Sequence, residues 1–485
     1  MDYISGIDRN QSCISSLEDA IDENNPIRFI DAYISRLDIG EMGFEHSEPQ
    51  DTGRPAYAPR DLLKLYLYGY FNRVRSSRNL EKERHRNVEV MWLLNGLCPD
   101  HKTIARFRQN NPKALKKVFQ DFVRLCAGLG LYGKELIAID GSKFKAWNGK
   151  DRNYTKGKIQ DRIRRAEEKI TAYLEELEQA DKEMAAEDQV RAIEAAVQAL
   201  VERRTELEGY LESITCGEET QVSLTDPDSR LMKTKDGMSV CLNVQTAVDS
   251  KNKMVVEFAV CNQVQDKNLM SPMAEKASEI LSVDHMTIVA DNGYDSVSDV
   301  AQVLAGNNIP VVCGDYEFWY PTTEEEAETV TGYDETIARS VYIPSRNVYI
   351  CPMGKFLYPS CYITKKHIAK YGNPSACSHC PKKCTTMRYF YVERMIKKSE
   401  FSKECDLSPV PLKKIRVLQN KAISSQRKCI VEHPFGTVKH DMGVRQLLLR
   451  GIRKAEGELL LAFLAFNMKR ALNVVGIKNL MTALR

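Results

Sequence analysis

The sequence predicts a mixed α/β protein with an all-helical N-terminal region and two insertions, one helical and one rich in cysteine. Apolar residues recur at helical spacing up to about residue 130. Short apolar runs typical of strands alternate with helical segments between residues 134 and 314. A glycine-poor stretch rich in Ala, Glu, Lys and Arg interrupts this alternation at 156–212. A chain of 485 residues has room for two or three domains.

Composition excludes several classes of protein. Hydrophobic residues make up 43% and charged residues 28% of the chain, proportions typical of folded rather than disordered proteins. The sequence has no uninterrupted apolar run of about 18 residues and no signal peptide at its start, so we expect a cytoplasmic protein that does not contact a membrane. Fourteen cysteines in such a chain indicate reduced thiols and one metal site rather than a disulfide framework.

Charge is strongly segregated, although the net charge is only +3. Residues 1–53 contain twelve acidic and three basic side chains. Residues 54–124 contain sixteen basic and six acidic ones, and residues 394–454 contain fifteen and five. Two such basic blocks favour a polyanion such as double-stranded DNA, because each phosphate contact releases counterions. For either block alone, a solvated helix face would be the simpler explanation.

The N-terminal region is predicted to be helical. Residues 1–53 form an acidic arm, and residues 54–133 form a basic region in which Pro59 begins the first helix. Residues 99–108 have the pattern of a turn followed by a helix.

A turn followed by a helix that carries arginines on one face is typical of helix-turn-helix proteins, which insert such a helix into a DNA groove. Arg106 and Arg108 are therefore candidate DNA contacts. The alternative is a plain surface helix.

The region after residue 134 is predicted to form the sheet. Residues 135–140 have the pattern of a buried strand whose tip carries Asp140, and residues 286–290 that of a strand that ends at Asp291. The other predicted elements of this region are strands at 238–249, 254–261 and 309–313 and helices at 268–280 and 296–305.

Two strand-end aspartates and a glutamate on a helix suit phosphodiester chemistry assisted by metal ions. Asp140, Asp291 and Glu432 supply the hard oxygen ligands that Mg²⁺ prefers, and two such ions can stabilise both the attacking and the leaving oxygen. Lys439 lies two helical turns after Glu432, so both can face one groove, and Lys428 or Arg427 lies one turn before Glu432. Lys439 on one side, and Lys428 or Arg427 on the other, are candidates for holding a DNA phosphate beside the metals.

Four motifs make the chain similar to the DDE transposases of bacterial insertion sequences. They are IDGSK at 139–143, DPDSRLM at 226–232, VADNGYD at 289–295 and VEHPFGTVK at 431–439. The basic region at 54–130 also resembles the DNA-binding region of one such group.

The resemblance implies a ribonuclease H-like catalytic domain in which Asp140, Asp291 and Glu432 hold two Mg²⁺ or Mn²⁺ ions. It also implies the reaction. Hydrolysis at the terminal inverted repeats of the element frees a 3′-hydroxyl, which attacks target DNA within a synaptic complex held by a homodimer. One related group has Tyr and Arg before the glutamate, whereas Ser425 and Lys428 stand at those positions here.

With this resemblance the chain divides into six parts. They are an acidic helical arm at 1–53, a helix-turn-helix-like DNA-binding domain at 54–133, a ribonuclease H-like core at 134–155 and 213–314, a helical-hairpin insertion at 156–212, a cysteine-containing insertion at 315–418, and C-terminal helices at 419–485 that complete the core.

Asp226 and Asp228 compete with the three acids for a catalytic role. The sequence Asp-Pro-Asp-Ser around them is typical of a turn before a strand, which is a common position for aspartate. We therefore expect them to support the site or contact substrate rather than to hold the metal ions.

The cysteines at 377, 380 and 384 have the spacing of a zinc knuckle. Tetrahedral Zn²⁺ takes four thiolate or imidazole ligands. Cys377, Cys380 and Cys384 would supply three, with Cys351 as the best fourth. The alternatives for the fourth ligand are Cys361, His379 and Cys405. Such a site would be structural, because an insertion with little apolar content needs a crosslink.

Two other functions remain open on the sequence. One is a sequence-specific DNA-binding protein with an inactive or domesticated nuclease core. The other is an interaction protein built on the helical hairpin and the cysteine module. The presence of all three acids argues against the first. The second predicts weak, salt-insensitive DNA binding, which a salt titration of affinity would exclude.

Overall fold

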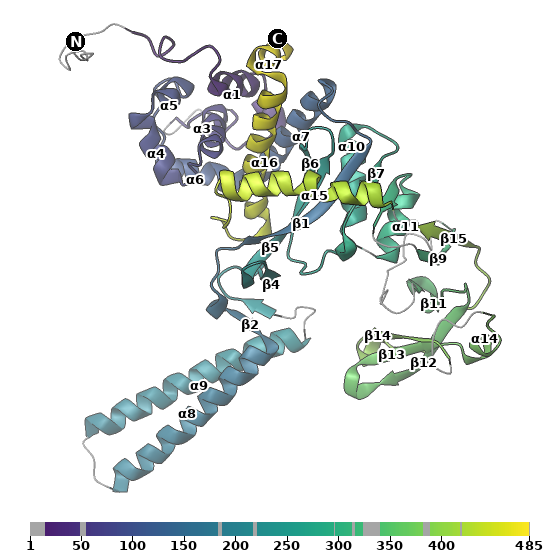
Figure 1. The fold of residues 1–485 in the computed structure, drawn as a ribbon. Helices are drawn as coiled ribbons and strands as arrows, with labels where there is room; N and C mark the ends of the chain where they lie inside the picture. The colour runs from purple at the N-terminus through teal and green to yellow at the C-terminus, as the bar shows by residue number, and fades with distance from the viewer. Residues whose placement is uncertain are drawn as a thin grey trace, which may run out of the picture.

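The structure is a computed structural model. The residues that it describes are 15–48, 55–182, 187–216, 221–294, 296–312, 316–323, 340–381, 389–417 and 420–484. Figure 1 shows a compact body of helices packed around a central sheet, from which a long helical hairpin and a small β-rich insertion project in different directions.

Helices make up the described N-terminal region, as the sequence predicts. They are α1 (Pro26–Ser35), α2 (Ile39–Met42), α3 (Pro59–Phe71), α4 (Ser77–Arg86), α5 (Val88–Leu93), α6 (His101–Asn110) and α7 (Pro112–Gly128). Proline stands in the first turn of α1, α3 and α7, where its missing N–H leaves no hydrogen bond unmade. Asp100 caps α6 by accepting a hydrogen bond from N of Thr103 at 2.7 Å.

A six-stranded sheet forms the centre of the described structure. Its strands are β1 (Leu136–Lys145), β4 (Arg230–Thr234), β5 (Gly237–Asp249), β6 (Val255–Cys261), β7 (Thr287–Val289) and β8 (Ile309–Val311). β1 is antiparallel to β5 on one side and parallel to β7 on the other, and β8 continues in parallel beyond β7. β4 and β6 pair with successive halves of β5 at its other edge.

β1 is longer than the sequence predicts. The predicted strand ends at Asp140, but β1 continues to Lys145, and Asp140 pairs with Thr246 in its middle. The strand continues because β5 offers partners as far as Cys241. The long, regular β5 therefore decides where β1 ends, and a local pattern around Asp140 could not indicate this.

One hydrophobic core joins the N-terminal helices to the sheet. Helix α16 (Ile452–Val475) is buried around most of its circumference. Phe463 of α16 and Phe119 of α7 both pack on Phe258 of β6, with ring centroids 4.8 and 5.7 Å apart. α10 (Met270–Leu281), α11 (Val297–Ala305) and α15 (Lys421–Gly436) also pack around the sheet, and α15 crosses its front in Figure 1.

No single helix in the described ranges is long and apolar enough to cross a membrane. α16 and the following α17 (Ile477–Ala483) satisfy the length and composition of a span only as a pair, and they are bent by 108°.

The helical hairpin leaves the body through a two-stranded ribbon. β2 (Asn153–Thr155) pairs with β3 (Gln221–Ser223), and between them α8 (Lys156–Lys182) and α9 (Glu187–Cys216) run side by side (Figure 1). A small separate core at the base of the hairpin includes Tyr154, Ile159 and Leu207. The helices lie where the sequence predicts a helical pair.

The second insertion is a small β-structure on a two-stranded stem. β9 (Tyr316–Pro321) and β15 (Leu412–Val417) form the stem. The insertion itself is a five-stranded antiparallel sheet: β10 (Val341–Ile343), β11 (Val348–Ile350), β12 (Phe356–Ile363), β13 (Ile368–Gly372) and β14 (Tyr391–Met395). The short helix α14 (Pro374–Ser378) lies between β13 and β14. It has its own small core, in which Tyr349 and Tyr371 are buried.

Candidate active site

Asp140 and Asp291 lie next to each other on the sheet. Ala138 of β1 pairs with Val289 of the parallel β7, so two residues further along Asp140 and Asp291 fall level with each other. Neighbouring strands are about 4.8 Å apart, which lets the two carboxylates interact. The charge of Asp291 is accordingly one of the causes that raise the pKa of Asp140. The structure brings together these two of the three acids that the sequence indicates.

The surroundings of Asp140 disfavour an uncompensated negative charge. Burial raises its pKa to about 6, the charge of Arg427 opposes this shift, and the charges of Asp291 and Asp266 add to it. N of Gly141 donates a hydrogen bond to Oδ1 of Asp140 at 3.0 Å. A divalent cation between the aspartates would relieve their repulsion, and carboxylate oxygens are the ligands that Mg²⁺ prefers. This donor set fits the metal that the sequence predicts.

Of the two cations that the sequence offers one turn before Glu432, Arg427 is the one that contacts Asp140. Its Nη1 lies 3.2 Å from Oδ2 of Asp140, and both side chains are largely buried. Lys428 is exposed on the next position of α15. Neighbouring helical residues point about 100° apart, so only one of the two can face the sheet.

Glu432 does not join the two aspartates. Its side chain is exposed and forms no hydrogen bond or ion pair with the part of the chain that the structure describes. Arg427, Val431 and Phe435 are four residues apart and turn toward the sheet, which directs Glu432 to the solvent side of α15. Within the described residues, no group of three or more His, Cys, Asp and Glu side chains is arranged to hold a metal ion.

Lys439 turns toward the sheet although Glu432 does not. A π-helical segment, Thr437–Asp441, follows α15 and places an extra residue in the turn. Nζ of Lys439 donates hydrogen bonds to Oγ of Ser142 at 2.6 Å and to the carbonyl oxygen of Lys143 at 2.7 Å. The expectation that Glu432 and Lys439 face one groove assumed a regular α-helix, and it is wrong for this structure.

Burial, with a smaller contribution from the charges of Lys235 and Lys143, lowers the pKa of Lys439 to about 8 against the opposite effect of Cys241. The ammonium group also lies over the ring of Phe144, 4.3 Å from its centroid. Lys439 is thus charged at neutral pH and held by Ser142 and Lys143, two and three residues along β1 from Asp140.

A buried polar network that the sequence analysis missed lies beneath Gly141. A Cβ atom on Gly141 would stand 2.4 Å from Nε2 of Gln245 and 2.8 Å from Oδ1 of Asp266. That carboxylate oxygen accepts hydrogen bonds from Lys143 at 3.1 Å, Asn243 at 2.6 Å and Gln245 at 2.8 Å. The glycine after Asp140 was the one local indication of this close approach.

Asp266 also lies close to Asp291. Oδ1 of Asp291 and Oδ2 of Asp266 are 3.0 and 3.8 Å from the point where a Cβ of Gly293 would stand. The third carboxylate beside the two aspartates is therefore Asp266, which belongs to the loop between β6 and α10.

Asp226 and Asp228 hold the start of α16. Oδ1 of Asp226 accepts a hydrogen bond from N of Gly451 at 3.0 Å, and Oδ2 of Asp228 accepts one from N of Ile452 at 2.8 Å. These N–H groups lie at the N-terminus of the helix, where they lack partners within it. The two aspartates act in the fold as helix caps.

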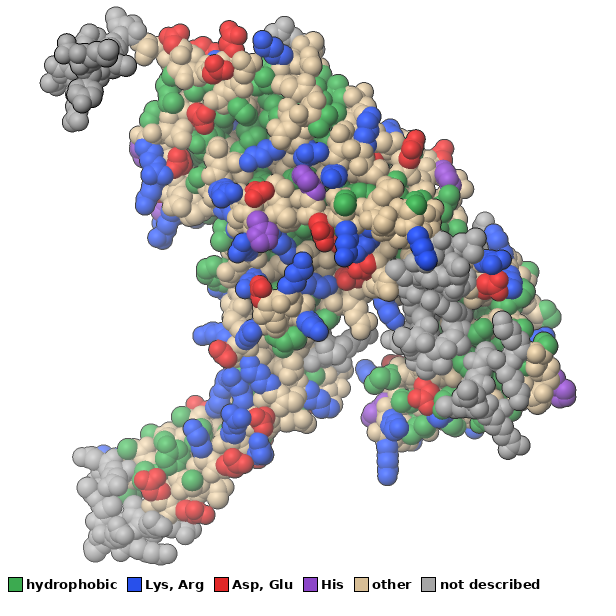
Figure 2. Space-filling view, viewed as in Figure 1, with side chains coloured by type: hydrophobic (Ala, Val, Ile, Leu, Met, Phe, Trp, Pro, Cys, Tyr) green, Lys and Arg blue, Asp and Glu red, His purple; other side chains and the backbone are tan. Residues whose placement is uncertain are grey.

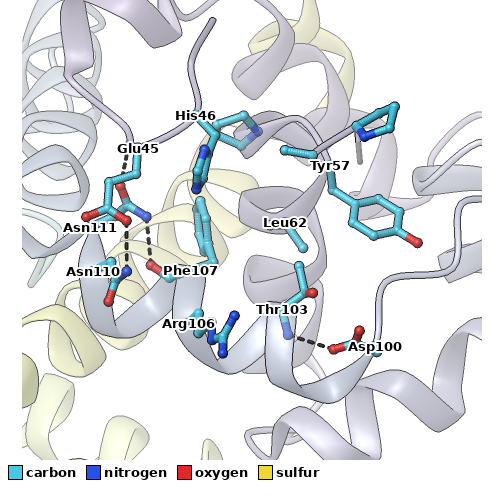
Figure 3. Close-up of a pocket in the computed structure, with 13 residues that line it drawn as sticks. Glu45, His46, Tyr57, Leu62, Asp100, Thr103, Arg106, Phe107, Asn110 and Asn111 are labelled. Carbon is cyan, nitrogen blue, oxygen red and sulfur yellow. Dashed lines mark hydrogen bonds between the residues drawn. The ribbon is translucent and has the colours of Figure 1, made fainter. Parts of the chain in front are cut away.

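Arg108 is buried in the structure, contrary to the prediction that it contacts DNA. It is 4% exposed, its guanidinium lies over the ring of Tyr66, and Nη1 donates to the hydroxyl of Tyr70 at 3.3 Å. Arg106 is exposed. It lines a pocket of about 250 Å³ with Tyr57 and Phe107, as Figure 3 shows. Two residues apart on α6, the arginines point to nearly opposite sides, so only Arg106 can meet a ligand.

Cys351, Cys377 and Cys380 lie near one another in the second insertion. Burial raises the pKa of Cys351, and the charges of Cys377 and Cys380 raise it further. N of Lys355 donates a hydrogen bond to Sγ of Cys351 at 3.3 Å. The fourth predicted ligand, Cys384, lies outside the described residues.

Two family models match the chain. One, described as a transposase domain (DUF772), matches residues 15–110, which contain α1 to α6. The other, described as a transposase DDE domain, matches residues 350–472, which contain α15 with Glu432 and most of α16.

No curated protein matches the chain. The chain is similar to a solved structure, the cryo-EM structure of a piggyBac transposase synaptic complex with hairpin DNA. The two are 10% identical, and the match covers 95% of this chain and 79% of the piggyBac chain. The TM-score of 0.30 is too low to define the fold. With a transposase domain at its N-terminal helices and a DDE domain across the helix of Glu432, the chain belongs to the DDE-type transposases and is a transposase enzyme.

Proposed function

We propose that this transposase cuts the ends of its own insertion sequence and joins them to target DNA at the site of Asp140 and Asp291. One observation carries the proposal: Asp140 on β1 and Asp291, two residues beyond the end of the parallel strand β7, lie side by side in surroundings that raise the pKa of Asp140 to about 6. A pair of carboxylates that repel each other in a buried site is stabilised by divalent cations. We propose Mg²⁺ or Mn²⁺ for this role.

When bound, two such ions would stabilise the charge on the attacking and leaving oxygens of the phosphodiester. The chain's own residues hold the reactants. Asp140 and Asp291 would hold the ions from one side of the site. Lys439, fixed by Ser142 and the carbonyl of Lys143, would hold a DNA phosphate next to them. A charged lysine there counters the negative charge that builds up at the phosphate.

We assign Glu432 as the third acid of the triad, because it lies within the match to the DDE domain. From its exposed position its carboxylate reaches the aspartates only if α15 turns about its axis. Residues five apart on a helix point about 140° apart, so the same rotation would remove Arg427 from Asp140 and bring Glu432 toward it. In this proposal, Arg427 compensates the charge of Asp140 in the resting enzyme.

Three further parts of the proposal concern the rest of the chain. The strand order β6–β5–β1–β7–β8, with β1 antiparallel to β5 and parallel to β7, supports a ribonuclease H-like core. The basic N-terminal helices, with Arg106 exposed, would bind the terminal inverted repeats in the cytoplasm. Two ends must be held together for joining, so a homodimer is expected in the synaptic complex.

Cleavage of a DNA duplex that contains an end of the element tests the proposal. We expect nicking that requires Mg²⁺ or Mn²⁺ and falls at least about 100-fold in Asp140→Asn, Asp291→Asn and Glu432→Gln. Lys421→Gln, at the exposed start of α15, is the matched control and should retain cleavage within a few-fold. Cleavage by all three acid variants at the wild-type rate would refute the assignment.

A second candidate function is a DNA-binding protein that no longer cuts. The observation in its favour is that Glu432 points to solvent while Arg427 occupies Asp140. If this candidate is correct, the wild-type protein binds end-containing DNA but does not nick it with Mg²⁺, Mn²⁺ or any other divalent ion.

We also propose a structural Zn²⁺ held by Cys351, Cys377, Cys380 and Cys384. Its support is that Cys377 and Cys380 each lie near enough to Cys351 to raise the pKa of its thiol, and that N of Lys355 donates a hydrogen bond to Sγ of Cys351. Metal analysis of the purified protein should find one zinc per chain. Cys377→Ser should release it and lower the melting temperature, whereas Cys361→Ser, on an exposed cysteine of the same insertion, should not.

A further inference from the structure

Trp147 is exposed just beyond the catalytic strand. It follows the end of β1 by two residues, and 45% of it is exposed. Its loop is fixed at both sides, since N of Ala146 donates to the carbonyl oxygen of Val240 at 3.0 Å and Nδ2 of Asn148 donates to Oγ of Ser223 at 3.0 Å. A large aromatic ring that a fixed loop presents to solvent is a typical contact for another molecule.

The other two tryptophans of the chain have intramolecular partners. Nε1 of Trp92 donates to Glu18, and the guanidinium of Arg28 lies over its ring. The ring of Trp319 packs against Gly354: a Cβ atom added to that glycine would stand 3.1 Å from the ring. Trp147 differs from both in its exposure.

The surroundings of Trp147 are strongly basic. Nine of the residues from 143 to 165 are Lys or Arg, and two are acidic. Lys145, Lys150 and Arg152 are exposed and form no ion pair within the described part of the chain. N of Lys145 donates to the carbonyl oxygen of Arg445 at 3.3 Å, which adds a further exposed cation beside it. Figure 2 shows Lys and Arg side chains gathered from the front of the sheet to the root of the helical hairpin.

These cations are continuous with the active site. Lys439, Lys145 and Lys143 all act on the buried thiol of Cys241: burial raises its pKa to about 11 against the opposite effect of these three charges. Lys439 is also the residue fixed next to Asp140 by Ser142. Basic side chains therefore run from the aspartates along β1 to the loop of Trp147.

We propose that Lys145, Trp147, Lys150 and Arg152, here named the Trp147 surface, bind the DNA that leaves the active site. The three cations would contact phosphates, and the indole would stack on a base exposed where the duplex is distorted. Seven residues at about 3.3 Å each separate Asp140 from Trp147. The contact thus lies about 23 Å, or roughly seven nucleotides at 3.4 Å, from the cleaved bond. This inference rests on the proposed function, because it takes the DNA path to begin at Asp140.

A second copy of the chain is a weaker candidate for this surface. A twofold interface places the same patch on both partners, so it would bring these unpaired cations against each other. Like charges at an interface are unfavourable, whereas a phosphate backbone complements them.

The fluorescence of Trp147 provides a direct test. The variant Trp92→Phe/Trp319→Phe/Asp140→Asn has Trp147 as its single tryptophan and cannot cleave. Titration with duplex DNA that contains an element end and extends at least ten base pairs beyond it should quench its emission and protect it from iodide. A duplex cut four base pairs from the cleavage site should bind without this effect.

The salt dependence of DNA affinity provides the second part of the test. In the Asp140→Asn background, Lys150→Gln should lower the slope of log affinity against log salt by about 0.9, as expected for one lost phosphate contact. Lys478→Gln, on an exposed lysine of α17, is the matched control and should leave the slope unchanged. Trp147→Ala should weaken binding of the long duplex roughly tenfold, and Trp147→Phe should restore most of it.

The results separate this inference from the proposed function. Unchanged fluorescence and an unchanged slope for Lys150→Gln would overturn the Trp147 surface, even if the wild-type enzyme cuts DNA. Quenching without any cleavage by the wild-type enzyme would support the surface and contradict the proposed function. If Trp147→Ala changes the oligomeric state of the protein in solution but leaves its DNA affinity unaltered, the surface is a protein interface, and the inference is also overturned.

Discussion

Arg427 places its guanidinium 3.2 Å from the carboxylate of Asp140. The ion pair fixes the rotation of α15 relative to β1 and holds Glu432, five residues later, on the solvent side. The position of Glu432 and the charge balance of Asp140 are therefore linked, and a change in one should alter the other.

Loss of Arg427 should make Asp140 harder to ionise. The charge of Arg427 lowers the pKa of Asp140 against burial and against Asp291 and Asp266, so Arg427→Gln should raise that pKa above 6. A metal ion binds the ionised carboxylate, so the pH midpoint of Mn²⁺ binding, followed by electron paramagnetic resonance, should move upward. Lys428→Gln should leave the midpoint in place. A downward shift would show that Arg427 acts mainly by competing with the metal.

Asp140→Asn should stabilise the metal-free protein at neutral pH. The folded pKa of about 6 exceeds the unfolded value of 3.8, so the folded state binds the extra proton and stability falls as pH rises between these values. Asparagine avoids this loss of stability, which amounts to up to about 3 kcal/mol in the free energy of unfolding. The substitution also removes the ion pair with Arg427, which makes the net gain smaller. Urea denaturation with EDTA should show the gain at pH 7.5 and none at pH 4. Equal stability of the two proteins at both values would contradict the shifted pKa.

Gly141→Ala should destabilise the protein, whereas Gly149→Ala should not. The new Cβ at position 141 would stand 2.4 Å from Nε2 of Gln245 and 2.8 Å from Oδ1 of Asp266, whereas nothing lies within 4 Å at position 149. Overpacking of this kind costs roughly 1–3 kcal/mol. Denaturant unfolding of the two variants measures the difference, and a fully stable Gly141→Ala protein would be inconsistent with the packing beneath β1.

Arg75→Ala should destabilise the junction between the N-terminal helices and α16. Nη2 of Arg75 lies 2.6 Å from Oε1 of Glu458, which is fully buried, and also donates to the carbonyl oxygen of Gln446 at 2.6 Å. Removing one partner leaves a buried charge unpaired, at a cost of about 3–5 kcal/mol. Arg164→Ala, which breaks an exposed pair with Asp161, should change the unfolding free energy little. Similar small effects for both variants would exclude this role for Glu458.

Lys439 should set the alkaline limit of cleavage. Its pKa of about 8 means that its charge is lost as pH rises through that value, and with it the contact to a DNA phosphate. Lys439→Arg keeps the charge at all these values and should extend cleavage above pH 8. Lys428→Arg should keep the wild-type profile. A pH–rate profile for the three proteins provides the comparison, and an alkaline limb shared by all of them would assign it to another group.

The sequence alone predicted where most helices and strands lie and singled out Asp140 and Asp291, which the fold places side by side. Apolar periodicity located the N-terminal helices, the helical hairpin and the strands around Asp140 and Asp291, because local patterns of burial reflect local structure. The motifs around these residues indicated the family that the transposase domain models also match.

The tertiary structure decided which side chains meet. Burial of Arg108, the pairing of Arg427 with Asp140 and the place of Asp266 depend on contacts between residues far apart in the chain. The π-helical segment after α15 separates Lys439 from Glu432, and regular helical spacing could not anticipate it. A sequence pattern fixes the period of an element, but the direction of each side chain is set by what packs against it.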